Sequence, residues 1–212
     1  MKLSPVITLL ASTSAAILET RQTPPADQIT IVSAQTSGNG CPQGTVSTSF
    51  STDKTVVTFG FDAFQTYIGP GTKPADKSKN CQIHLTLHYP GGFQYSLMTA
   101  TYHGYARLDP TVTGSFLSTY YFSQDASRSA SSKTTLTGPQ YLSGAVYQKT
   151  DTVENASTIW SPCGAEGILN VNNRIALTTS GNDKNASGEL SDDDATVAFE
   201  QKVAVKWRTC TK

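Results

Sequence analysis

Apolar and polar residues alternate with a period of two along several segments of this chain. In the segment 197–207, apolar side chains such as Phe199 and Trp207 share one parity, which only Gln201 interrupts, and charged side chains such as Glu200 take the other. This pattern predicts a strand with one buried face and one solvated face. The same alternation runs through residues 57–61, 83–89, 116–122 and 169–177.

Turn-forming residues separate these segments, as in Ser51–Lys54, Gly69–Gly71 and Gly138–Pro139. We find no stretch in which apolar residues keep the helical period over three turns. The sequence therefore predicts an all-β fold, and in particular a single disulfide-stapled antiparallel β-sandwich.

The segment LHYPGGFQYS, residues 87–96, joins two alternating runs. Pro90 suits the first position of a type I turn, and Gly92 suits the left-handed residue that closes a bulged hairpin loop. In the resulting register Leu87 faces Tyr95, and all apolar side chains lie on one face. We therefore predict a β-hairpin, which explains the motif without a ligand.

The beginning of the chain is typical of an exported protein. Lys2 precedes a short apolar run and small residues follow at 14–16, so residues 1–16 are predicted to be a secretory signal peptide rather than a short buried helix. The polar residues 17–37 are expected to form a flexible leader or propeptide, and residues 38–212 the β-sandwich domain. The signal peptide predicts a secreted, extracellular location. Because no run of eighteen apolar residues occurs, we expect no membrane span.

The charge balance narrows the classes of partner. Lysine and arginine number 16, as do aspartate and glutamate, and the formal net charge is zero. Nucleic-acid-binding domains carry a basic face, so this composition argues against a nucleic-acid partner.

Four cysteines are available for disulfide bonds: Cys41, Cys81, Cys163 and Cys210. An even number in an exported chain predicts two disulfides, and the spacing is too wide for the close pairs of a zinc site. Of the three possible pairings we favour Cys41 with Cys81 and Cys163 with Cys210, because each would tie an early loop to a nearby strand end.

Two sequons, at Asn155 and Asn185, predict N-glycosylation of exposed loops. The second overlaps a segment that resembles a calcium loop, in which Asp183, Asn185 and Ser187 take positions 1, 3 and 5 and Asp194 takes position 12. No flanking helices are predicted, and a glycosylated Asn185 would be a poor ligand. A polar loop is therefore the simpler interpretation, with calcium as the alternative and no other cofactor expected.

Three aromatic residues are candidates for ligand binding: Tyr67, Tyr121 and Trp160. Tyr121 follows Tyr120, and adjacent strand residues point to opposite faces, so one of the two is expected to be exposed. Trp160 lies three residues before Cys163, where packing on a disulfide is the alternative to binding. Exposed aromatic rings can stack on sugar rings, although strand aromatics more commonly pack in the core.

Several motifs together resemble a family of secreted proteins of filamentous fungi, known as domain of unknown function 4360. They are KNCQIHLTLHYPGGFQYSL (Lys79–Leu97), YIGPG (Tyr67–Gly71), STYYFS (Ser118–Ser123), WSPCG (Trp160–Gly164) and LNVNNRIAL (Leu169–Leu177). The similarity extends from about Gly38 to Cys210. It implies an exported, cysteine-bridged fungal protein and brings no catalytic residues with it.

The sequence contains no G-x-S-x-G, H-E-x-x-H or phosphate-loop motif. A glycosidase needs two carboxylates that face each other across a sugar. Asp62, Asp109 and Asp125 are the candidates, although acidic residues in β-rich loops more often form turns. The sequence favours a non-catalytic extracellular protein that binds a glycan, a cell-wall polymer or a host surface. A secreted effector is one role that such a protein would have. Loops 67–79 and 150–164 are the expected binding regions, and an extracellular hydrolase acting on polysaccharide is the alternative.

Overall fold

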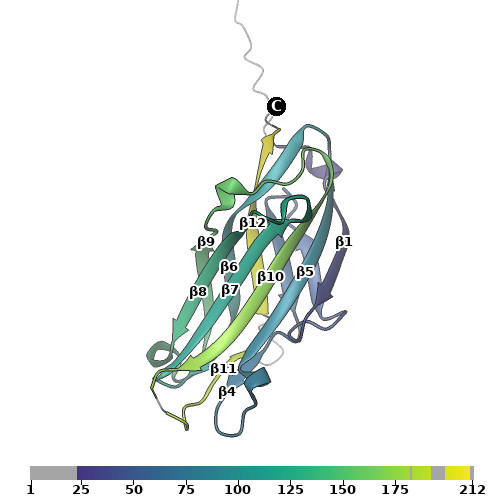
Figure 1. Ribbon diagram of the computed structural model, residues 1–212. Helices are drawn as coiled ribbons and strands as arrows, with labels where there is room; N and C mark the ends of the chain where they lie inside the picture. Colours follow the sequence, from purple (N-terminus) through teal and green to yellow (C-terminus); the bar gives the residue numbers. More distant parts are fainter. Residues whose placement is uncertain (1–22, 182, 192–198, 211–212) are drawn as a thin grey trace, which may run out of the picture.

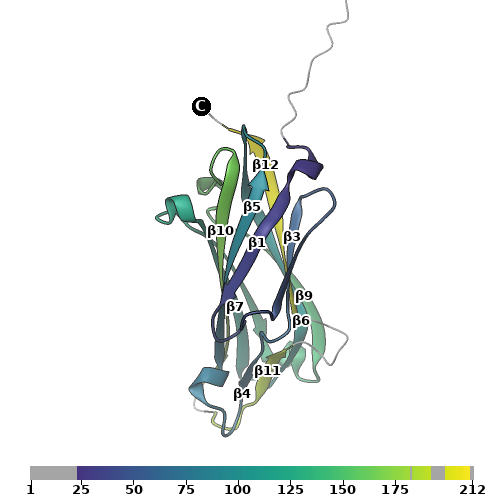
Figure 2. The same cartoon turned by 90° about the vertical axis from the view of Figure 1, so that its right-hand side faces the viewer.

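Two antiparallel β-sheets packed face to face make up the fold (Figures 1 and 2). The structure is a computed structural model that describes residues 23–181, 183–191 and 199–210. The five-stranded sheet contains, in spatial order, β1 (Thr30–Ser37), β5 (Ser78–Tyr89), β10 (Ala165–Thr179), β7 (Val112–Phe122) and β8 (Ala130–Thr137). The seven-stranded sheet contains β2 (Val46–Phe50), β3 (Val56–Phe61), β12 (Phe199–Thr209), β6 (Phe93–Leu108), β11 (Gly188–Ser191) and β4 (Thr66–Ile68), and β9 (Ala145–Thr152) also pairs with β6.

Short 3-10 turns supplement the strands: η1 (Ala26–Gln28), η2 (Pro74–Asp76), η3 (Ser123–Asp125), η4 (Gly138–Tyr141) and η5 (Ala156–Thr158). The predicted all-β sandwich is confirmed. Within the described ranges, no helix has the length and hydrophobicity needed to cross a membrane.

The five alternating segments correspond to β3, β5, β7, β10 and β12, although residues 197 and 198 lie outside the described residues. Their apolar parity faces the interior, where Ile83, Leu85 and Leu87 have no exposed surface. Burying the apolar face of each strand between the sheets removes it from water, which is the main driving force for this arrangement.

The turn at residues 90–92 joins the two sheets instead of two neighbouring strands. β5 pairs with β1 and β10, whereas β6 pairs with β12, β9 and β11, so the predicted β-hairpin is wrong. Tyr89 and Tyr95 meet across the sandwich, with ring centroids 5.5 Å apart. A hairpin and an arch between sheets both direct the same side chains toward the interior, so alternation does not distinguish them.

The folded domain begins earlier than the sequence pattern indicates. Residues 30–37 form β1, which pairs antiparallel with β5, so the predicted leader 17–37 ends too late and the domain starts before residue 38. The strand was missed because its side chains are all half-buried or exposed, as expected at a sheet edge. The predicted signal peptide, residues 1–16, lies outside the described residues.

The pairing of β1 with β5 is irregular. Ile31 lies opposite Leu87 and Ser33 lies opposite Thr86, so Val32 is an extra residue in the edge strand. The side chain of Val32 is 53 % exposed. This geometry is a β-bulge, which bends and twists the strand that contains it.

A buried hydrogen-bond network connects the two sheets near the centre of the core. Gln201, the polar residue that interrupts the apolar face of β12, donates hydrogen bonds to the hydroxyls of Ser118 and Tyr120, each at 3.0 Å. Asn173 donates to the Gln201 amide oxygen at 2.7 Å. The polar interruption in the pattern is therefore satisfied inside the protein, as buried polar groups require.

The two disulfide bonds have the predicted pairing, Cys41–Cys81 and Cys163–Cys210. The first links the connection between β1 and β2 to β5. The second links the segment after β9 to the residue that follows β12. Each bridge therefore fixes a connection against a strand of the core.

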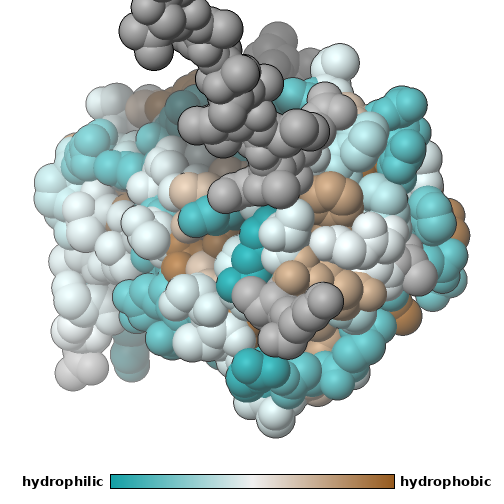
Figure 3. All heavy atoms as spheres, turned by 90° about the horizontal axis from the view of Figure 1, so that it is seen from above, coloured by the Kyte–Doolittle hydropathy of each residue, from teal (hydrophilic) through white to brown (hydrophobic). Residues whose placement is uncertain are grey.

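The two loop regions expected to bind ligands lie at opposite ends of the sandwich. In Figure 1 the loop that leads from β4 to η2 is at the lower end, and the green turn η5, after β9, is near the upper end. Viewed from the upper end, apolar residues form separate patches among polar ones (Figure 3). A single binding surface therefore cannot use both loops.

Candidate functional site

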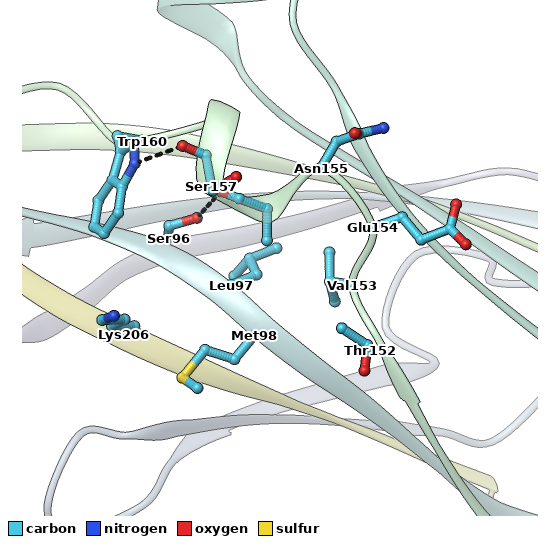
Figure 4. Close-up of a pocket in the computed structure, with 11 residues that line it drawn as sticks. Ser96, Leu97, Met98, Thr152, Val153, Glu154, Asn155, Ser157, Trp160 and Lys206 are labelled. Atoms are coloured by element: carbon cyan, nitrogen blue, oxygen red, sulfur yellow. Dashed lines mark hydrogen bonds between the residues drawn. The ribbon is translucent and has the colours of Figure 1, made fainter.

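An open groove of about 420 Å³ lies beside the segment that connects β9 to β10 (Figure 4). Strand β6 and the connecting segment supply most of its walls. The lining residues are Ser96, Leu97, Met98, Thr152, Val153, Glu154, Asn155, Ala156, Ser157, Trp160 and Lys206. The groove thus belongs to the predicted binding region 150–164.

The groove exists because the segment after β9 separates from β6 and then pairs with it again. The N–H of Val153 donates to the carbonyl of Met98 at 2.8 Å, which continues the pairing of β9 with β6. The chain then departs and rejoins β6 where the Ser161 N–H donates to the Tyr95 carbonyl, also at 2.8 Å. The looped-out residues between these two points form one wall.

Contacts to both sheets hold this wall in place. Glu154 exchanges two backbone hydrogen bonds with Ser131 of β8, at 2.6 and 3.1 Å. The Ser96 hydroxyl donates to the Ala156 carbonyl at 2.6 Å. Because both sheets support the loop, the groove is formed before any ligand binds, and little ordering entropy would be lost on binding.

A β-bulge in β6 turns a methionine into the groove. Val203 lies opposite Ala100, and Val205 lies opposite Leu97. Between these two pairs β6 therefore contains one residue more than β12. Leu97 and Ala100 are therefore both buried, whereas Met98 is 48 % exposed. Bulges commonly redirect side chains next to binding sites.

Trp160 closes one end of the groove and is fixed on two sides (Figure 4). Its indole N–H donates to the Ser157 carbonyl at 3.1 Å. The guanidinium of Arg208 lies over its ring, with Cζ 3.5 Å from the centroid. Gln94 lies opposite Arg208 on β6. With its side-chain oxygen facing the guanidinium, Gln94 accepts hydrogen bonds from Arg208. The half-buried indole is thus a rigid platform, and the alternative of packing on the disulfide is not needed to explain its position.

The remaining groove residues combine an apolar floor with a polar rim. Leu97 and Val153 lie between Trp160 at one end and Glu154 at the other (Figure 4). Lys206 is exposed on the side of Trp160. A floor that packs against C–H faces and a rim that hydrogen-bonds hydroxyls suit a sugar.

The described lining of the groove contains one carboxylate, that of Glu154. The acidic residues considered for a hydrolase lie on three other connections. Asp62 follows β3, Asp109 accepts a hydrogen bond from the Ser187 N–H, and Asp125 forms an ion pair with Arg128. Hydrogen bonds from Ser127 and Arg128 lower the pKa of the Asp125 carboxyl, whereas a catalytic acid needs a raised pKa.

The other two predicted ligand-binding aromatics lie elsewhere. Tyr67 is on β4, is 39 % exposed, and donates its hydroxyl to the side-chain oxygen of Gln65. Tyr121 is on β7 of the five-stranded sheet, where its hydroxyl accepts a hydrogen bond from Gln82. Tyr67, Tyr121 and Trp160 therefore do not form one aromatic row.

The segment considered as a calcium loop begins in the connection between β10 and β11. Asp183 uses one carboxylate oxygen to accept the Asn185 N–H at 3.1 Å and the other to accept the Thr111 hydroxyl at 3.3 Å. Ser187 donates its N–H to Asp109, and Asp194 lies outside the described residues. In the part of the chain that the structure describes, no three His, Cys, Asp or Glu residues are placed to hold a metal ion. Calcium stays the alternative to a polar loop.

The two sequon asparagines occupy different regions. Asn155 is exposed at the rim of the groove, has a left-handed backbone with φ of 58°, and precedes η5. Asn185 is exposed in the β10–β11 connection at the other end of the molecule. Only Asn155 is therefore a neighbour of the groove.

Sequence reasoning missed four residues that line the groove, Ser96, Leu97, Met98 and Lys206, and it also missed Arg208, which stacks on Trp160. These residues come from β6 and β12, and the register that brings them to Trp160 is not visible in the sequence. One signal was available: Leu97 and Ala100 are apolar at a spacing of three, which breaks the alternation where the bulge lies.

The chain belongs to the family described as "Domain of unknown function (DUF4360)", whose profile matches residues 27–210. It is also similar to a protein of Arthroderma benhamiae (strain ATCC MYA-4681 / CBS 112371) named "Uncharacterized secreted protein". The two are 43 % identical over 188 residues, which cover 89 % of this chain and 74 % of the relative. The resemblance predicted from the motifs is confirmed.

The chain also matches two solved structures at low similarity. One is described as TmCBM61 in complex with β-1,4-galactotriose, with a TM-score of 0.24 and 9 % identity over 84 % of this chain and 88 % of that one. The other concerns carbohydrate-binding modules of the β-sandwich superfamily, with a TM-score of 0.28 and 12 % identity over 82 % of this chain and 56 % of that one.

Proposed function

We propose that this chain is a secreted, non-catalytic extracellular protein that binds a glycan in the groove between Trp160 and Glu154. The observation that carries the proposal is the position of Trp160, a rigidly held indole at the end of a preformed groove with an apolar floor. A sugar ring gains most from such a platform because its C–H face packs on the indole while its hydroxyls reach the polar rim.

Secretion is supported by the predicted signal peptide, by the two disulfide bonds and by the relative named as a secreted protein. The single carboxylate in the described lining favours binding over hydrolysis, since glycoside hydrolysis ordinarily needs a pair. The glycan would belong to a cell wall or a host surface, and in the latter case the protein would act as an effector.

The test is retention of the purified protein on insoluble chitin, β-glucan and cellulose, combined with an assay for released reducing sugar. We expect retention on at least one polymer without product, and loss of retention in Trp160→Ala at a temperature at which that variant is still folded. Tyr67→Ala is the matched control, because it removes a part-exposed aromatic at the other end of the sandwich and should leave retention intact. Release of sugar by the wild-type protein, or full retention of Trp160→Ala, would overturn the proposal.

A further inference from the structure

The rim of the groove carries a glycosylation sequon whose geometry bears on how the groove is used. Asn155 lines the groove and Ser157, which completes the sequon, lines it as well. Both side chains are exposed, and the Asn155 side chain makes no capping hydrogen bond to the turn that follows it. The acceptor amide is therefore accessible from solvent, as N-glycosylation requires.

The backbone around Asn155 fixes where an attached glycan would begin. The Asn155 carbonyl accepts hydrogen bonds from the N–H of Thr158 at 2.9 Å and from its hydroxyl at 2.7 Å. The preceding residue, Glu154, is bound to Ser131 on β8. The first sugar is thus anchored at a fixed point on the rim, with the groove directly beside it.

The groove offers that sugar a surface on which to pack. Met98 supplies exposed apolar surface, at 48 % exposed, beside the buried side chains of Leu97 and Val153. An exposed apolar surface of this kind is covered at a gain in free energy by any group with an apolar face. The N-acetylglucosamine units that begin an N-glycan have such a face, and they are tethered beside the groove at high effective concentration.

We propose that an N-glycan on Asn155 lies over this groove and covers Met98. If the groove also binds an external glycan, a consequence that rests on the proposed function, the attached glycan competes with that ligand. Glycosylation of Asn155 would then determine how much of the secreted protein is able to bind. The competition is intramolecular, so it would persist at any protein concentration.

Oxidation of Met98 provides a readout that does not depend on any external ligand. The sequence contains two methionines, of which the other is Met1 in the predicted signal peptide. Peroxide converts an accessible methionine to its sulfoxide at a rate that follows its exposure. A glycan lying over the groove should therefore slow the appearance of a single sulfoxide in the mature protein.

The experiment uses the full chain secreted from a glycosylating fungal host, with the variants Asn155→Gln, Ser157→Ala and Asn185→Gln. The first two remove the same sequon through different residues, so an effect that they share belongs to the glycan. Asn185→Gln removes the other sequon, far from the groove. Glycopeptide mass spectrometry measures occupancy, peroxide oxidation reports on Met98, and the polymer assay reports on binding.

We expect Asn155 to be occupied, and Met98 to oxidise several-fold faster in Asn155→Gln and Ser157→Ala than in the wild type or Asn185→Gln. Retention on the polymer should rise in the same two variants. If Asn155 is unmodified, or if Met98 oxidises equally fast in all four proteins, the inference is overturned. If Met98 is protected in the wild type but no variant binds a polymer, the glycan cover stands and the proposed binding function fails.

Discussion

The guanidinium of Arg208 is stacked on the indole of Trp160, with Cζ 3.5 Å from the ring centroid. Two residues beyond Arg208 is Cys210, and its disulfide partner Cys163 lies three residues beyond Trp160. The same two segments are therefore joined twice, once covalently and once by a cation–π contact. This double connection holds the indole at the end of the groove.

The first prediction concerns the stacked arginine. Arg208→Ala should lower the free energy of unfolding by about 0.5–2 kcal/mol, the usual range for a cation–π contact, and should make the Trp160 indole more accessible to acrylamide quenching. Arg208→Lys should retain part of the effect, since it keeps the charge but lacks the planar group. Lys202→Ala, on the same strand, is the control and should leave quenching unchanged. Equal quenching in Arg208→Ala and wild type would show that the stack does not position the indole.

The second prediction compares the two disulfides. Replacing Cys163 and Cys210 by serine should cost about 2–5 kcal/mol of stability and should also weaken polymer retention, because the bridge supports the wall of the groove. Replacing Cys41 and Cys81 should cost a similar amount and leave retention intact at temperatures where the variant is folded. Chemical denaturation and the polymer assay measure the two effects separately. Loss of retention in both double variants would contradict the assignment of the groove.

The third prediction concerns the buried network around Gln201. Gln201→Leu leaves the hydroxyls of Ser118 and Tyr120 short of a partner, and should destabilise the protein by about 1–3 kcal/mol. Gln148→Leu, at an exposed position on β9, should change stability by less than about 0.5 kcal/mol. Urea denaturation of the two variants tests the difference. A Gln201→Leu protein as stable as the wild type would mean that the network contributes no net stability.

The fourth prediction concerns alkaline pH. Burial raises the pKa of Tyr95, Tyr120 and Tyr147 well above the ordinary value of 10.0. The unfolded chain releases these phenolic protons near pH 10 while the folded chain retains them, so the stability they contribute is full below about pH 10 and is lost as the pH rises further. The phenolate absorbance of these residues should therefore appear only together with unfolding.

Tyr95→Phe tests the origin of this alkaline instability. The Tyr95 hydroxyl is buried and has no hydrogen-bond partner among the described residues, so its removal should be neutral or stabilising at pH 7. The variant should also lose stability less steeply above pH 10. A wild-type pH dependence in Tyr95→Phe would show that this phenol loses its proton at the same pH in the folded and unfolded chains.

The strands of the core were predictable because burial imposes a period of two on their side chains. Gln201 was visible as an exception, although its partners on β7 and β10 were not, since they depend on how the two sheets face each other. The arch at residues 90–92 was predicted as a hairpin for the same reason. Alternation records which side of a strand is buried and says nothing about which strand lies beside it.

The candidate site was predictable only in part. Trp160 was identified from its type and from its loop, whereas Met98 and Lys206 reach the groove through strand register and a bulge. β1 was missed because an edge strand with both faces partly solvated carries no periodic signal.

The extra residue Val32 in the edge strand β1 affects the tendency of the protein to aggregate. A straight edge strand presents a regular row of unpaired N–H and C=O groups, on which a strand of another molecule can dock and start aggregation. The bulge breaks this row in β1 and twists the edge, so an incoming strand would lose its pairing after a few residues. β1 thereby covers one side of β5 and at the same time makes a poor template for a second chain.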